Sequence, residues 1–145
     1  MVNKQNLNKS ALIDTSFLIS IFINNDISIN KTHYILNDIQ KFNKLYITNL
    51  IYIETATILS QRLGKSQFIR AEEELETLNL TEIFVNNSID STVRKLFRNT
   101  KQKDISYVDL ATAYIAKEKS ISHVISYDKH FKYLSIQFKF GLLGV

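Results

Sequence analysis

The sequence predicts an α/β fold in which helices cover both faces of a central, mostly parallel sheet of four to five strands. Short apolar and β-branched segments alternate with helical patterns of ten or more residues, an alternation typical of parallel sheets. The chain has no proline and three glycines, which argues against an all-β fold built on tight turns. We find no linker, repeat or low-complexity segment, so residues 1–145 are expected to form one domain.

The first half of the chain is expected to contribute two strands. A short apolar run precedes a segment that is apolar on every side, as a helix buried against a sheet would be. Asn49 is a candidate N-cap and Gly64 a helix-ending glycine. The expected elements are a strand at 11–13, a helix at 15–23, a helix at 31–43, a strand at 45–48 and a helix that follows Asn49 and runs to about 63.

The second half is expected to complete the sheet. Its helices show apolar residues at three- and four-residue spacing, and its strands are short apolar runs. Asn86 or Ser88 is the candidate cap of the helix that ends near residue 99. The expected elements are a helix from 66, a strand at 82–85, a helix that starts after Asn86 or Ser88 and reaches about 99, a helix at 106–119, a strand at 123–126, a helical turn at 128–133 and a possible fifth strand at 136–138.

Composition narrows the kind of site that the chain can carry. The absence of cysteine excludes disulfides, thiol nucleophiles and thiolate metal sites. Three scattered histidines leave little for a zinc site, so a metal would be held by oxygen, which favours Mg²⁺ or Mn²⁺. The net charge of +4 modestly favours a polyanionic partner. Because no signal peptide or membrane-spanning run is visible, we expect a cytoplasmic protein without a membrane partner.

Four acidic residues occupy comparable places near strand ends. Asp14 ends the first strand, Asp128 lies just past the fourth, Glu54 follows the second and Asp109 begins the helix that feeds the fourth. If the first and fourth strands are neighbours, these carboxylates converge where parallel sheets bind ligands. Two like charges at 4 Å repel by about 4 kcal/mol, a conflict that a divalent cation removes. The pattern therefore predicts metal-assisted hydrolysis of a phosphate ester.

Each acid also has a structural interpretation. Asp14 could cap the helix that starts at Thr15, and Ser106 with Asp109 fits a capping box. Glu54 could be an exposed helical glutamate, and Asp128 could cap the turn after it. The metal-site hypothesis is favoured because all four structural interpretations would have to hold at once and still place the acids at one edge of the sheet.

The ordered motifs resemble a known family. They are Asp14-Thr-Ser-Phe-Leu, Glu54, Ile105-Ser-Tyr-Val-Asp109 and Val124-Ile-Ser-Tyr-Asp128-Lys-His-Phe. The set resembles the PIN domain and, within it, the VapC-type toxin ribonucleases of toxin–antitoxin systems. The resemblance implies a three-layer α/β/α sandwich, a metal-dependent endoribonuclease, an antitoxin partner and a homodimer.

The resemblance also implies roles for individual residues. Asp14, Glu54, Asp109 and Asp128 match the acidic catalytic positions, and Asp14, Asp109 and Asp128 are expected to hold the metal. Ser16 and Ser126 match hydroxyl positions that support the site. Asp104 is an extra acid without a family counterpart.

Basic residues are expected to bind the RNA backbone beside the acids. Arg94, Lys95 and Arg98 precede the helix that bears Asp109, and Lys129 follows Asp128. The alternative is that these basic residues only form solvated helix faces.

Two other functions stay open: an RNA-processing nuclease of the same family and a non-catalytic RNA-binding module. A haloacid-dehalogenase-type phosphatase is disfavoured, because the segment after the first strand lacks the second acid of a D-x-D motif.

Overall fold

The computed structural model describes residues 9–23 and 29–145. Its five strands form one sheet, parallel throughout, in the order β3-β2-β1-β4-β5. The predicted α/β class is therefore confirmed, and the first and fourth strands are neighbours, with Ile13 opposite Ile125. The strands are β1 (Ser10–Ile13), β2 (Lys44–Thr48), β3 (Thr81–Ile83), β4 (His123–Ile125) and β5 (Gly141–Leu143).

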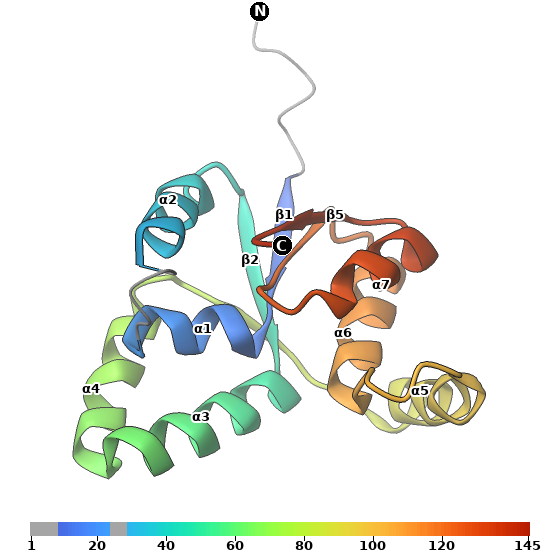
Figure 1. Cartoon of the computed structure of the whole chain (residues 1–145), viewed down its shortest axis with the longest axis horizontal. Helices are drawn as coiled ribbons and strands as arrows, with labels where there is room; N and C mark the ends of the chain where they lie inside the picture. Colours follow the sequence, from blue (N-terminus) through green and yellow to red (C-terminus); the bar gives the residue numbers. More distant parts are fainter. Residues whose placement is uncertain (1–8, 24–28) are drawn as a thin grey trace, which may run out of the picture.

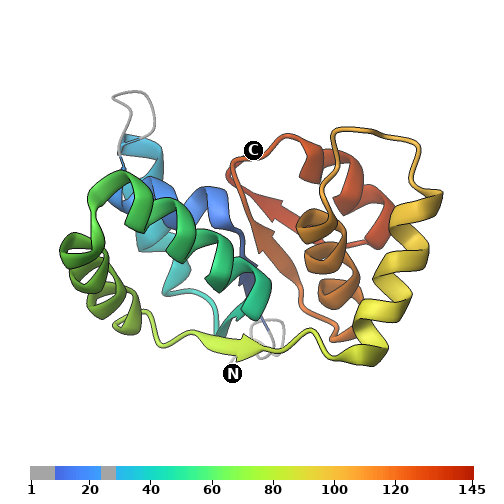
Figure 2. The ribbon, with the colours of Figure 1, turned by 90° about the horizontal axis from the view of Figure 1, so that it is seen from below.

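Seven helices in the described residues cover the two faces of this sheet. Figure 1 shows α1 to α4 on one side of the strands and α5 to α7 on the other. Seen from below in Figure 2, β3 crosses between the two groups, leading from α4 to α5. The helices are α1 (Thr15–Phe22), α2 (Ile29–Ile39), α3 (Asn49–Leu63), α4 (Lys65–Glu76), α5 (Asn87–Asn99), α6 (Tyr107–Glu118) and α7 (His130–Phe138).

The core lies between the sheet and its helices. Strand residues Leu12 and Ile125 are fully buried, and so are Phe17 of α1, Leu110 of α6 and Phe131 of α7. Burial of such side chains contributes roughly 1.5–3 kcal/mol each. The sheet is thus shielded on both faces, and its carboxyl edge, where β1 and β4 end, is held in a fixed place.

The predicted fifth strand at 136–138 is wrong. These residues form the last turn of α7, and β5 follows at Gly141–Leu143. Phe131, Leu134 and Phe138 are buried, whereas Ile136 is 80% exposed. Burial therefore recurs every three or four residues in this segment, which is the period of a helix.

One predicted cap is also wrong. The N-cap of α3 is Thr48, whose Oγ accepts a hydrogen bond of 3.1 Å from the Ile51 amide. The side-chain Oδ1 of Asn49 instead accepts a hydrogen bond of 2.8 Å from the Val85 amide, which links the start of α3 to the segment after β3. The other predicted cap is correct, because Asn86 caps α5.

The connection between α3 and α4 is a single residue. Gly64 is the C-cap of α3 and has φ +82° and ψ 158°, a backbone conformation that is essentially restricted to glycine.

Among the helices that the structure describes, none combines the length and apolarity needed to cross a membrane.

Candidate metal centre and active site

Asp14 directly follows β1 at its carboxyl end, and its hydrogen bonds hold it there. Its amide donates to the Ile125 carbonyl at 2.9 Å, which continues the pairing of β1 with β4. Its Oδ2 accepts from the Ser16 amide at 3.2 Å and makes Asp14 the N-cap of α1. The predicted capping interaction is therefore real, and it holds the carboxylate at the sheet edge.

Two serine hydroxyls link Asp14 to the segment that follows β4. Ser16 Oγ and Ser126 Oγ donate to Asp14 Oδ2 at 2.6 and 2.8 Å. The same hydroxyls accept from the amides of Tyr127 and Asp128, at 3.0 and 2.9 Å respectively. Ser16 and Ser126 thus fix the distance between Asp14 and the turn that carries Asp128.

Burial and hydrogen bonding shift the pKa of the Asp14 carboxyl in opposite directions. The residue is 4% exposed, and this burial raises the pKa of its carboxyl above the usual range, with a smaller contribution from the charge of Glu54. Hydrogen bonds from Ser16 and Ser126 oppose that rise. Both hydroxyls bind Oδ2, and no hydrogen bond from the described residues reaches Oδ1. A further ligand can therefore approach Oδ1.

Asp109 lies in the first turn of α6 and forms the predicted capping box. Its Oδ2 accepts from the Ser106 amide at 2.9 Å, and its own amide donates to Ser106 Oγ at 3.1 Å. Burial raises the pKa of Asp109 to about 6, and the negative charges of Asp14 and Asp128 add to that rise. The carboxylates of β1, α6 and the β4–α7 segment therefore share one electrostatic environment.

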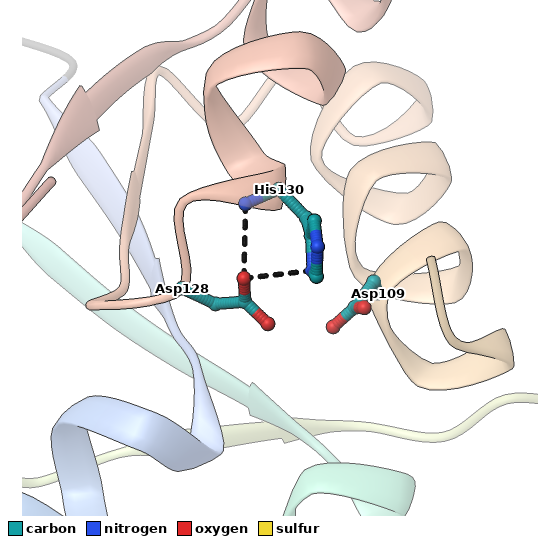
Figure 3. A group of neighbouring side chains, drawn as sticks. All are labelled: Asp109, Asp128 and His130. Atoms are coloured by element: carbon teal, nitrogen blue, oxygen red, sulfur yellow. Dashed lines mark hydrogen bonds and ion pairs between the residues drawn. The ribbon is translucent and has the colours of Figure 1, made fainter. Parts of the chain in front are cut away.

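Asp128 and Asp109 face each other across a small gap, with His130 beside them (Figure 3). One ligand atom from each of these three residues lies within 4.8 Å of the others, and we call this set the ligand group. Asp128 Oδ1 accepts from the His130 amide at 2.9 Å. The ring Nδ1 of His130 also lies 2.9 Å from Asp128 Oδ1, but it is not aligned for a hydrogen bond.

Glu54 approaches the same region from α3. Its Oε2 accepts a hydrogen bond of 2.6 Å from Thr15 Oγ1, so the side chain is directed toward the start of α1. Its charge contributes to the raised pKa of Asp14. Glu54 and Asp14 border the ligand group without belonging to it.

The structure thus brings the four predicted acids together at the carboxyl edge of β1 and β4. Asp104 is exposed at the turn before α6 and lies outside the ligand group. Sequence reasoning missed His130 as a site residue. Its position two residues after Asp128 was the available indication, because a turn at that point returns the side chain to the carboxylate.

The predicted RNA-binding residues lie on two exposed surfaces. Arg94, Lys95 and Arg98 are exposed on α5, and Lys129 is exposed beside Asp128. Arg94 Nε binds Asp90 Oδ2 at 2.6 Å, so a phosphate would compete with an existing partner there.

A hollow of about 550 Å³ joins part of this surface to the start of α6. Arg94 and Arg98 line it together with Tyr107, which precedes Asp109 by two residues. The Phe97 and Tyr107 rings meet edge to face at 5.9 Å between centroids. The hollow therefore combines cationic and aromatic side chains at the start of α6, and Asp90 also lines it.

The sequence matches the family model of the PIN domain over residues 11–136. This chain belongs to the PIN domain family. The match contains all four site acids and both supporting serines. No curated protein sequence matches the chain.

Solved structures share the PIN fold at low sequence identity. The VapC20 toxin of Mycobacterium tuberculosis, described as cleaving the sarcin–ricin loop, has 18% identity and a TM-score of 0.74, covering 85% of this chain and 93% of that one. VapBC2 of Rickettsia felis, bound to promoter DNA, has 16% identity and a TM-score of 0.69, with coverages of 92% and 96%. FitAcB of Neisseria gonorrhoeae has 16% identity and a TM-score of 0.64, with the same coverages. These likenesses confirm the fold.

The donor set at this site fits a hard divalent cation. Carboxylate oxygens are the ligands that Mg²⁺ and Mn²⁺ prefer, and Asp109 and Asp128 present them within one small gap. The raised pKa of Asp109 shows that burial and neighbouring negative charge disfavour its ionised form. A bound cation would reverse that preference, because it stabilises the charged carboxylate.

Proposed function

We propose that this PIN-domain chain is a metal-dependent endoribonuclease, the toxin of a VapBC-like toxin–antitoxin system, acting in the cytoplasm. The observation that carries the proposal is the convergence of Asp14, Asp109 and Asp128 where β1 and β4 end. The shared electrostatic field, in which the charges of Asp14 and Asp128 raise the pKa of Asp109, supports a cation as the missing partner. The likeness of the fold to VapC20 and VapBC2 supports the toxin role.

Asp14, Asp109 and Asp128 would hold Mg²⁺ or Mn²⁺ in this proposal. When bound, the ion would supply a polarised water and would neutralise charge on the phosphate. Ser16 and Ser126 act as positioning residues, since they bind Asp14 and the segment before Asp128 at once.

Glu54 has a separate role in the proposed reaction. It approaches the site from α3, and Thr15 orients its carboxylate by a 2.6 Å hydrogen bond. It would accept a proton from the attacking water, as a carboxylate within hydrogen-bond reach does in general base catalysis.

The substrate and partner follow from charge. Lys95, Arg98 and Lys129 are exposed, and Lys129 directly follows Asp128. In this proposal they contact the RNA backbone while one phosphate enters the metal site. An antitoxin would cover this acidic centre, with an arginine placed against the carboxylates. We also propose that the chain forms a homodimer.

The test is cleavage of single-stranded RNA by the purified protein. We expect cleavage with Mg²⁺ or Mn²⁺, none with EDTA, and a loss of at least about 100-fold in Asp14→Asn and Asp109→Asn. Glu73→Gln is the matched control. It removes one negative charge, as the site variants do, but from an exposed glutamate on α4.

Three results would contradict parts of the proposal. Undiminished cleavage by both site variants would remove the assigned mechanism. Metal-independent RNA binding without any cleavage would favour a non-catalytic RNA-binding module instead. Cleavage that is unaffected by a neighbouring antitoxin gene product would favour an RNA-processing nuclease over a toxin.

A further inference from the structure

The ring of His130 has an unexplained environment. Its Nδ1 is shielded from solvent, yet it finds no hydrogen-bond partner among the described residues. A buried polar atom without a partner costs roughly 1–3 kcal/mol. The nearest charged atom is Asp128 Oδ1 at 2.9 Å, but the two atoms are not aligned for a hydrogen bond.

This spacing matches two ligands of one ion. In an octahedral site with bonds of about 2.0–2.1 Å, neighbouring ligand atoms lie about 2.8–3.0 Å apart. Their lone pairs point at the ion and not at each other, which is why such pairs fail as hydrogen bonds. His130 Nδ1 and Asp128 Oδ1 show both features, the 2.9 Å separation and the misalignment.

The carboxylate of Asp109 lies close enough to Asp128 and His130 to bind the same ion. The ligand atoms of Asp109, Asp128 and His130 all lie within 4.8 Å of one another. Ligands on opposite sides of an octahedral ion are about 4.0–4.2 Å apart, so a shift of less than about 1 Å would bring all three onto one ion. Figure 3 shows the edge of the His130 ring between the two carboxylates.

We propose that His130 is a ligand of the divalent cation, and that its nitrogen makes the centre select Mn²⁺ over Mg²⁺. The proposal rests on the metal site under "Proposed function" and adds a ligand to it. Imidazole suits transition metals, whereas Mg²⁺ prefers oxygen and keeps several of its waters. Removing the ring therefore weakens Mn²⁺ binding, while water replaces it on Mg²⁺ at little cost.

The direct test is pulsed electron paramagnetic resonance on the Mn²⁺-loaded protein. A ring nitrogen bound to Mn²⁺ modulates the electron spin echo, and we expect this modulation in the wild type and its loss in His130→Ala. His33→Ala is the matched control, since His33 is an exposed histidine on α2 and its removal leaves the modulation unchanged.

Calorimetric titration gives a second, independent measurement. We expect His130→Ala to weaken Mn²⁺ binding by at least about tenfold and Mg²⁺ binding by less than about threefold. Thermal unfolding in EDTA checks that both variants fold.

The outcomes separate this inference from the proposed function. A wild type that binds Mn²⁺ without nitrogen modulation, and whose affinity survives His130→Ala, overturns the role of His130 and leaves the carboxylate site intact. A wild type that binds neither ion overturns both.

Discussion

Replacing Asp109 by asparagine is expected to stabilise the metal-free protein while it abolishes metal binding. The folded structure raises the pKa of this carboxyl from 3.8 to about 6, so holding it ionised at neutral pH costs free energy. Asparagine has a similar shape and no charge, and its carbonyl oxygen can keep the 2.9 Å hydrogen bond from the Ser106 amide. The substitution therefore removes the penalty and retains the helix cap.

The magnitude follows from the pKa. A rise of roughly two units corresponds to about 3 kcal/mol, which is an upper value because the site can relax or admit water. We expect the free energy of unfolding of Asp109→Asn to exceed that of the wild type by about 1–3 kcal/mol above pH 7. In a chain of this size, this corresponds to a rise in Tm of roughly 2–12 °C.

The pH dependence has a defined sign. Because the pKa of Asp109 is higher in the folded state, the folded protein binds more protons than the unfolded chain between about pH 4 and pH 6. The wild type therefore loses stability as the pH rises through this window, relative to the variant. The difference in free energy of unfolding between the wild type and Asp109→Asn should be small near pH 4 and should reach its maximum above pH 7.

The assay is thermal unfolding of both proteins in EDTA at pH 4 to 8, with Asp104→Asn as the control for an exposed acid. Adding Mn²⁺ should make the wild type the more stable of the two proteins, since it gains stability from binding the ion and the variant does not. The reasoning is refuted if Asp109→Asn is the less stable protein at pH 8 in EDTA, or if the difference is independent of pH.

Three further substitutions test other parts of the account. Ser126→Ala removes a 2.8 Å hydrogen bond to Asp14 and should lower the free energy of unfolding by about 1.5–3 kcal/mol; urea denaturation measures this, and no change would contradict it. Gly144→Ala should destabilise by about 1–3 kcal/mol or more, because a Cβ would lie 2.2 Å from the Ser126 carbonyl oxygen. Gly64→Ala is its control, with a positive φ but open space around it. Arg98→Ala should weaken RNA binding and reduce the salt dependence by about one phosphate contact, whereas an unchanged salt dependence would remove Arg98 from the RNA surface.

The sequence predicted the sheet and its acids because both depend on local patterns. Short apolar strands indicated the buried sheet. Asp14 could be placed because it directly follows a strand, and Asp128 because it lies a few residues past one. Asp109 could be placed because the capping box fixes it in the first turn of a helix. Parallel pairing of β1 with β4 then brings the three residues to one edge.

What the sequence did not predict depends on tertiary contacts. His130 joins the site because the turn after Asp128 brings its ring beside the two carboxylates. Asn49 lost its predicted capping role because it binds the Val85 amide, 36 residues away in sequence. The misplaced fifth strand is different, because burial at 131, 134 and 138 follows a helical period that was already visible in the sequence.

The most direct test of the central claim is the position of a bound ion. Crystals grown with Mn²⁺ should show an anomalous difference peak between Asp109 and Asp128, within bonding distance of a carboxylate oxygen of each. Full occupancy of Mn²⁺ elsewhere on the molecule, with no peak between these two carboxylates, would contradict the account.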